Sequence, residues 1–351
     1  MVCIRNLPLT PYFSLWNRIK GFEPEMLDDA LYRRKALVKT WFMRGTLHVV
    51  PSKDMPVYHS ALKRMWFEHH RRYMNDPSWP SVQERQKLLY PKIVEALAEK
   101  PLRRKELNDR VRSLLGDESQ PYKRLFSAWG GVLKETSYLG LTLYAQPCGK
   151  EACFARVDQW LPNISLDKID ECEAREKLLL KYLHCYGPAS VQDFACWSGL
   201  LTSEASEAIE NSTEDLTEVQ VGSSKKSLWM LKKDFKPLEE IDLQEKAPLC
   251  LLPKYDSYLL GHKDRVRIID EEFLKQVYRP VVGDIAATVL FNGRIAGTRI
   301  HKKTNKKLTI NVKLFKKLDK ESLKELEQAA KDLGTFMKTN EARVSLNSKT
   351  A

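Results

Sequence analysis

Residues 175–235 read REKLLLKYLHCYGPASVQDFACWSGLLTSEASEAIENSTEDLTEVQVGSSKKSLWMLKKDF, and this segment is the most informative part of the sequence. Apolar residues at helical spacing end at Gly187, which a proline follows, and this pair is typical of the end of a helix. Ser190, with Asp193 three positions later, predicts a capping box that begins a second helix. Thr202 begins a third helical pattern, so the segment predicts three consecutive helices.

A hairpin is predicted directly after these helices. Residues 216–221 and 227–231 are strand-like, and the turn between them carries Lys225 and Lys226 at its tip. Three helices followed by a hairpin form a winged helix, a helix-turn-helix unit with an added β-hairpin. We therefore predict a winged helix over residues 166–236.

A second copy of the pattern precedes the first. Ser81 and Glu84 have capping-box spacing, and a short helix and a longer one, residues 121–137, follow. The hairpin after them has Lys150 in its turn. Residues 76–165 are therefore predicted to form another winged helix.

The N-terminal copy, predicted over residues 1–75, has one helix fewer. Residues 9–22 and 24–35 form the two predicted helices, residues 37–50 form the hairpin, and a long helix over 52–74 links this unit to the next. Two helices leave an apolar face uncovered. Either the true start lies upstream of the first residue, or neighbouring units cover that face.

From about residue 237 to residue 351 the composition becomes rich in strand-like runs. Asn292-Gly293 is a strong signal for a type I′ hairpin turn, and a helix is predicted over residues 321–333. We expect a small C-terminal β-barrel-like domain, so that the whole chain is an α+β protein of tandem winged helices with this domain at its end. The predicted strands are residues 249–252, 265–269, 285–291, 294–300, 307–314 and 342–346.

Composition favours a polyanionic partner. The chain of 351 residues has 58 Lys and Arg against 46 Asp and Glu, a net charge of +12. We find no apolar run of about 18 residues and no secretory signal, which predicts an intracellular, cytoplasmic protein without a membrane partner. The seven cysteines lack zinc-finger spacing and no nucleotide-binding motif is present, so we expect neither a metal nor a cofactor.

Basic hairpin tips are the candidate contacts to duplex DNA. Winged helices place the third helix in the major groove and the wing against the backbone, which makes Lys150, Lys225 and Lys226 candidate phosphate ligands. Lys302 and Lys303 belong to a further basic turn in the C-terminal domain. The alternative for each of them is a solvated turn residue.

Four segments resemble the winged-helix family of AlkZ-like DNA glycosylases, enzymes associated with azinomycin resistance. The resemblance implies three tandem winged helices, a C-terminal β-barrel and removal of bulky alkylated or cross-linked purines from duplex DNA. The segments are WFMRGTLH (41–48), WGGVLK (129–134) with WLP (160–162), YGPA (186–189) with WSGL (197–200), and LPKYD (252–256) with LLG (259–261).

The catalytic motif of that family departs from its pattern here. The family has Gln, an aliphatic residue, then Gln or Asp, before a Leu-Trp pair that resembles Leu15-Trp16. Counting back from that pair places the motif on Ile4-Arg5-Asn6. Glycosidic hydrolysis needs a group that positions or deprotonates water, and Asn6 is a candidate for positioning only, because an amide is no useful base.

Three other polar residues lie inside the family-like segments. Arg44, at a hairpin turn, is a candidate phosphate ligand, with a structural salt bridge as the alternative. His48 is a candidate DNA contact, although a histidine that anchors the hairpin by a hydrogen bond fits the sequence better. Asp256 is predicted to be a turn residue or a partner of Lys254.

Three hypotheses for function remain. The first is a glycosylase of the AlkZ-like type. The second is a DNA-binding protein without excision activity, a regulator or lesion binder. The third is a set of winged helices that mediates protein contacts.

Overall fold

The computed structural model describes residues 4–5, 9–73, 80–116, 126, 131–222, 226–242, 247–280 and 283–346. The chain forms two compact units. The large unit comprises Met1–Asn6 and Glu25–Lys232, and the C-terminal unit comprises Leu7–Pro24 and Lys233–Ala351. Within the described residues, none of the helices is long and apolar enough to cross a membrane.

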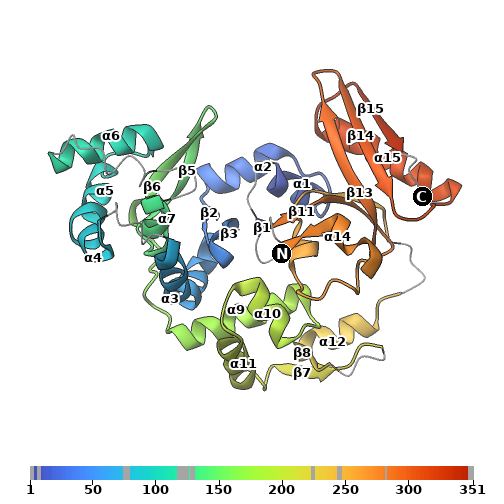
Figure 1. The fold of residues 1–351 in the computed structure, drawn as a ribbon, viewed down its shortest axis with the longest axis horizontal. Coiled ribbons are helices and arrows are strands. Elements are labelled where there is room, and N and C mark those ends of the chain that lie inside the picture. The colour runs from blue at the N-terminus through green and yellow to red at the C-terminus, as the bar shows by residue number, and fades with distance from the viewer. Residues whose placement is uncertain are drawn as a thin grey trace. The chain divides into compact units, whose positions relative to one another are not determined.

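The large unit begins with a short strand and a helix–hairpin group (Figure 1). The hairpin strands are joined by a 3-10 turn, Met43–Gly45, in which Arg44 has a left-handed backbone with φ of 53°. A π-helical turn, Asp29–Arg33, precedes the hairpin. The elements are β1 (Ile4–Arg5), α2 (Pro24–Asp28), β2 (Leu37–Trp41), β3 (Leu47–Pro51) and α3 (Met55–Tyr73).

The next group confirms the predicted capping box and hairpin. The Ser81 hydroxyl accepts a hydrogen bond from the backbone N–H of Glu84, and the Glu84 carboxylate accepts one from the N–H of Ser81. Of the helix predicted over residues 121–137, the described part is α7. The elements are α4 (Val82–Glu84), α5 (Tyr90–Ala96), β4 (Leu102–Arg103), α6 (Arg104–Leu115), α7 (Gly131–Tyr138), β5 (Thr142–Cys148), β6 (Glu151–Arg156) and α8 (Val157–Trp160).

The third group contains the three helices and the hairpin expected from its sequence. Ser190 and Asp193 form the predicted capping box, and Gly199 ends the second helix with a left-handed φ of 87°. Tyr182, Phe194 and Trp197 pack as an aromatic cluster between the first two helices. The elements are α9 (Glu171–Tyr186), α10 (Val191–Ser198), α11 (Thr202–Asn211), β7 (Leu216–Val219) and β8 (Leu228–Leu231), and α12 (Lys232–Glu239) follows.

The first two hairpins belong to one sheet, although their sequences predict two separate wings. The strand order is β1-β3-β2-β5-β6-β4, and β2 pairs with β5 where Lys39 lies opposite Tyr144. Trp41 packs on Tyr144 with ring centroids 4.9 Å apart. Because aromatic cross-strand contacts stabilise a sheet, this pairing joins the two groups through a common core.

The C-terminal unit contains an open five-stranded sheet, not a closed barrel. The strand order is β15-β14-β13-β12-β9, and the two end strands do not pair with each other, so the expected barrel closure is wrong. Asn292 and Gly293 both have positive φ at the predicted hairpin turn, as type I′ requires. The elements are β9 (Cys250–Leu252), α13 (Ser257–Leu260), α14 (Leu274–Val277), β10 (Tyr278–Arg279), β11 (Asp284–Ile285), β12 (Ala287–Phe291), β13 (Arg294–Lys303), β14 (Lys307–Leu314), α15 (Lys320–Phe336) and β15 (Glu341–Leu346).

Two further expectations for this part of the chain differ from the structure. Residues 265–269 form turns and not a strand, because the buried Arg265 guanidinium donates to the carbonyls of Leu259 and Lys263. The helix expected at residues 9–22 is shorter, α1 (Thr10–Trp16), and packs in the C-terminal unit. There Trp16 stacks on Phe336 of α15, with ring centroids 5.5 Å apart.

Candidate nucleic-acid interface

The segment that aligns with the family's catalytic motif begins on an edge strand. Ile4 and Arg5 form β1, which pairs with β3 so that Ile4 lies opposite Val49 and Arg5 opposite His48. The catalytic candidate, Asn6, lies outside the described residues. The described part of the motif is therefore attached to the six-stranded sheet of the large unit.

Arg44 is positioned by the end of helix α10. Its Nη1 donates to the carbonyl of Cys196 at 3.0 Å and also to that of Trp197. The last carbonyls of a helix lack partners within the helix and carry partial negative charge, so a guanidinium is favourable there. Gly199, which ends α10, has no Cβ and so leaves room for Arg44. A Cβ at position 199 would lie 3.4 Å from the Cγ of Arg44. The geometry favours a structural role through the carbonyls of the helix.

His48 is turned into the protein. It lies on β3, between β1 and β2, and the residue is only 2% exposed. Its Nδ1 lies 2.8 Å from the carbonyl oxygen of Thr46. A buried imidazole in the middle of a sheet is not available to DNA in this structure, so the anchoring alternative fits the geometry and the direct DNA contact does not.

The lysines of the hairpin tips in the large unit are exposed. Lys150 follows Gly149 in the turn between β5 and β6, where a Cβ on Gly149 would meet no atom within 4 Å. Lys226 is exposed just before β8, whereas Lys225 lies outside the described residues. Both described lysines can reach a phosphate from the surface of this unit.

The remaining basic candidates lie in the C-terminal unit. Lys302 and Lys303 are exposed at the end of β13, in the hairpin with β14. The Lys303 ammonium donates to the carbonyl of Met337 at 2.6 Å, next to the C-terminal end of α15. Lys302 is therefore the more accessible of the two for a phosphate.

Asp256 holds α1 in the C-terminal unit and does not face solvent. It is 0% exposed and accepts hydrogen bonds from the Ser14 hydroxyl at 2.8 Å and from the Arg18 guanidinium at 2.6 and 3.1 Å. It also caps α13 by accepting from the backbone N–H of Tyr258. The predicted turn role fits these contacts, but the ionic partner is Arg18, whereas Lys254 pairs with Asp284.

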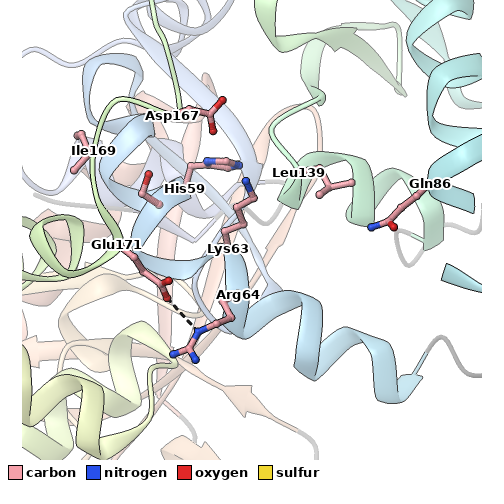
Figure 2. Close-up of a pocket in the computed structure, with 9 residues that line it drawn as sticks. His59, Lys63, Arg64, Gln86, Leu139, Asp167, Ile169 and Glu171 are labelled. Atoms are coloured by element: carbon pink, nitrogen blue, oxygen red, sulfur yellow. Dashed lines mark hydrogen bonds and ion pairs between the residues drawn. The ribbon is translucent and has the colours of Figure 1, made fainter. Parts of the chain in front are cut away.

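A polar pocket of about 450 Å³ in the large unit was not predicted from the sequence (Figure 2). His59 and Lys63, one turn apart on α3, line it together with Asp167. Figure 2 also shows the ion pair between Arg64 and Glu171, at 3.2 Å. The long helix carries no motif in its sequence, and the segment with Asp167 is more than a hundred residues away, so no local signal marks this pocket.

The histidine of this pocket offers hydrogen bonding but is not a strong base. His59 is 3% exposed, and neither of its ring nitrogens makes a hydrogen bond of ordinary geometry with the described residues. Burial, and to a lesser extent the charge of Lys63, lowers the pKa of His59 to about 4, and Asp167 offsets this only in part. The imidazole is neutral near pH 7 and can accept a hydrogen bond, but a pKa so far below neutral makes it a weak general base.

Metal chemistry has no evident site in the described parts of the chain. They contain no group of three or more His, Cys, Asp or Glu side chains placed to hold a metal ion. Cys148, Cys153, Cys172, Cys185, Cys196 and Cys250 are all free thiols.

These observations define a mixed α+β protein with exposed lysines at its hairpin tips. The family model described as "DNA glycosylase AlkZ-like" matches residues 6–336, so the chain belongs to the AlkZ-like DNA glycosylase family and the resemblance in its sequence is confirmed. A curated relative from Streptomyces sahachiroi, "Interstrand DNA cross-link repair glycosylase", is 28% identical over an alignment of 284 residues that covers 75% of this chain and 70% of that protein.

A solved structure shares the fold. "Streptomyces sahachiroi DNA glycosylase AlkZ" superimposes with a TM-score of 0.81 at 22% sequence identity, covering 98% of this chain and 91% of that one.

Proposed function

We propose that this protein is a DNA glycosylase that binds duplex DNA through tandem winged helices and hydrolyses the N-glycosidic bond of bulky alkylated or cross-linked purines. It acts in the cytoplasm, in association with DNA. The observation that carries the proposal is the family match over residues 6–336, together with the relative named as a cross-link repair glycosylase.

Exposed lysines support the DNA-binding part of the proposal. Lys150 and Lys226 lie at two hairpin tips, where the wings of winged helices contact the backbone of DNA. A Lys→Glu change at either position should weaken binding to every duplex sequence, and loss of one phosphate contact should reduce the slope of log K against log salt by about one. Lys168→Glu is the matched control, because Lys168 is equally exposed but lies in a loop. If all three changes weaken DNA binding equally, the lysines at the hairpin tips contribute only non-specific charge.

Hydrolysis requires a water molecule held against an oxocarbenium-like sugar. In this chain the aligned motif provides Asn6, whose amide can orient water by a hydrogen bond but cannot take its proton. The aliphatic Ile4 can do neither. The rate should therefore be limited by water activation, and not by binding of the lesion.

The second candidate function follows from the same residues. If Ile4 and Asn6 leave the motif inactive, the protein is a lesion binder or a DNA-binding regulator that does not excise the base. The discriminating assay incubates duplex DNA carrying a bulky N7-alkylguanine with the protein and cleaves the resulting abasic sites with alkali. The variants compared are Asn6→Ala and the double change Ile4→Gln with Asn6→Asp, which restores the family pattern at both signature positions.

The glycosylase proposal predicts excision by the unchanged chain, a loss with Asn6→Ala and an increase of about 10²- to 10⁴-fold with the restored pair, the usual contribution of a general base. Excision by the restored variant alone supports the non-catalytic candidate. If neither protein excises although both bind the duplex, the glycosylase proposal is wrong. Equal yields from the unchanged chain and Asn6→Ala would remove Asn6 from the mechanism.

A further inference from the structure

A second pocket, of about 670 Å³, lies wholly within the C-terminal unit. It is formed by the start of α1, by the residues after β9, by the β10–β11 hairpin and by neighbouring parts of β12 and β13. Its volume is in the range of about 300–1,000 Å³ that is typical of small-molecule sites. Lys150 and Lys226, the described residues that support the proposed DNA binding, do not line it.

Arg299 is the unusual residue of this pocket. It lines the pocket from β13 and is 3% exposed. Its Nη2 donates to the carbonyl of Leu251 at 2.9 Å, but Nε and Nη1 have no hydrogen-bond partner among the described residues. Burial lowers the pKa of Arg299 to about 10, so the guanidinium remains charged near neutral pH. A buried cation with unsatisfied donors is costly, and an anion that accepted from those donors would offset the cost.

The carboxylates near Arg299 form their ion pairs with other residues, and Asp256 acts on Arg299 through its charge. Asp256 forms its ion pair with Arg18, and Asp284 pairs with both Lys254 and Arg279. Among the lining residues, three cations, Lys254, Arg279 and Arg299, therefore face one carboxylate. The excess of positive charge favours a ligand that carries negative charge.

The rest of the lining is apolar and aromatic. Ile300 and Leu9 are 74% and 48% exposed, which is unusual for large aliphatic side chains that border a pocket. Phe13 and His301 meet edge to face with ring centroids 5.8 Å apart, and burial lowers the pKa of His301, which keeps that ring neutral. A ligand for this pocket therefore needs a flat or apolar body in addition to its anionic group.

We propose that this pocket binds a phosphate group carried on a nucleoside, with the phosphate at Arg299 and the base against His301 and Ile300. Arginine suits the phosphate because its guanidinium stays charged and its Nε–H and Nη1–H groups are the donors without a partner among the described residues. A free mononucleotide and the phosphorylated end of a DNA strand share this chemistry. The proposal does not depend on excision of a base.

The test is calorimetric titration of the full chain with adenosine 5′-monophosphate, adenosine and inorganic phosphate. We expect saturable binding of the nucleotide and at least tenfold weaker binding of adenosine and of phosphate. Arg299→Met, which keeps much of the side-chain volume, should weaken nucleotide binding at least tenfold. Lys331→Met removes the same charge from an exposed position on α15, outside the pocket lining, and should change the affinity less than twofold.

A second variant keeps the test valid if Arg299→Met fails to fold. Ile300→Glu places a negative charge at an exposed position on the rim and should weaken nucleotide binding without unfolding the unit. Oligonucleotides with a 5′-phosphate and with a 5′-hydroxyl distinguish the two sources of the phosphate: preference for the phosphorylated end over the mononucleotide assigns the site to DNA, and the reverse to a free nucleotide. The proposal is overturned if neither ligand binds saturably, or if binding is unaffected by the folded variants at positions 299 and 300.

Discussion

Replacement of Arg44 by alanine separates its two possible roles. The side chain links the β2–β3 turn to the C-terminal end of α10 by hydrogen bonds to the Cys196 and Trp197 carbonyls. A hydrogen bond from a charged donor contributes about 1.5–3 kcal/mol, and a cation at a helix C-terminus adds about 0.3–1 kcal/mol. Because Arg44 is exposed, water competes for these carbonyls, and we expect a total loss of about 1–2 kcal/mol.

Differential scanning calorimetry measures this loss. For a unit of this size each kcal/mol shifts the melting temperature by about 2–4 °C, so Arg44→Ala should lower Tm by about 2–8 °C. Arg44→Lys keeps the charge but not the planar fork, and should lower Tm by less. Arg44→Gly loses the same contacts as alanine, but it relieves the left-handed backbone at this position and should recover about 1 kcal/mol.

DNA affinity gives the refuting result. If Arg44 serves α10, the alanine variant should bind duplex DNA within about twofold of the unchanged chain at temperatures well below its Tm. An unchanged Tm together with an affinity loss of about tenfold, which corresponds to about 1.4 kcal/mol, would show that the guanidinium serves a phosphate and that our assignment to the helix carbonyls is wrong.

Three further changes test other parts of the structure. Glu135→Gln leaves the buried Arg85 guanidinium, 1% exposed, without its carboxylate and should destabilise the fold by about 3–5 kcal/mol in urea titration; a loss below 1 kcal/mol would contradict a buried ion pair. Lys254 and its neighbours lower the pKa of Asp284 from 3.8 to about 2, so the stability from this carboxylate is complete above about pH 4 and is lost as the pH falls toward 2. Asp284→Asn should flatten that dependence, and an unaltered pH profile would speak against the pairing. Gly199→Ala forces a Cβ onto a φ of +87° and should lower Tm by a few degrees, whereas an equal or higher Tm would exclude a left-handed backbone there.

Local features of the fold were predictable from the sequence. The capping boxes at Ser81 and Ser190 and the turn at Asn292-Gly293 depend on residues within four positions of each other, and all three are present. Such signals set where helices and hairpins begin and end. They give no information about which elements pack together, because that depends on contacts between distant parts of the chain.

The departures in how the elements pack together are long-range. Helix α1 joins the C-terminal unit because Ser14 and Asp256, separated by 242 residues, form a buried hydrogen bond. The first two hairpins share a sheet because Lys39 pairs with Tyr144. No periodicity within either segment encodes such a partner, so the sequence predicted independent units.

In the candidate site, too, some features follow from the local sequence and others depend on distant parts of the chain. The exposure of Lys150 and Lys226 follows from their positions in polar hairpin turns, which the sequence marks clearly. His48 is 2% exposed on β3, which pairs with the two-residue strand β1 near the start of the chain. The pocket around His59 depends on a loop far along the chain, and neither feature has a local signature.

The surroundings of three arginines and two lysines bear on how the chain can recognise DNA. Arg85 and Arg175 are buried against carboxylates, and Arg44 is held by helix carbonyls, whereas the hairpin tips Lys150 and Lys226 carry ammonium groups at the surface. Arginine is the residue that reads guanine edges by paired hydrogen bonds, while an ammonium acts on phosphates as a point charge. Binding through these lysines would be strongly dependent on salt and nearly independent of base sequence. A protein that must find a chemical lesion in any sequence context needs this kind of binding.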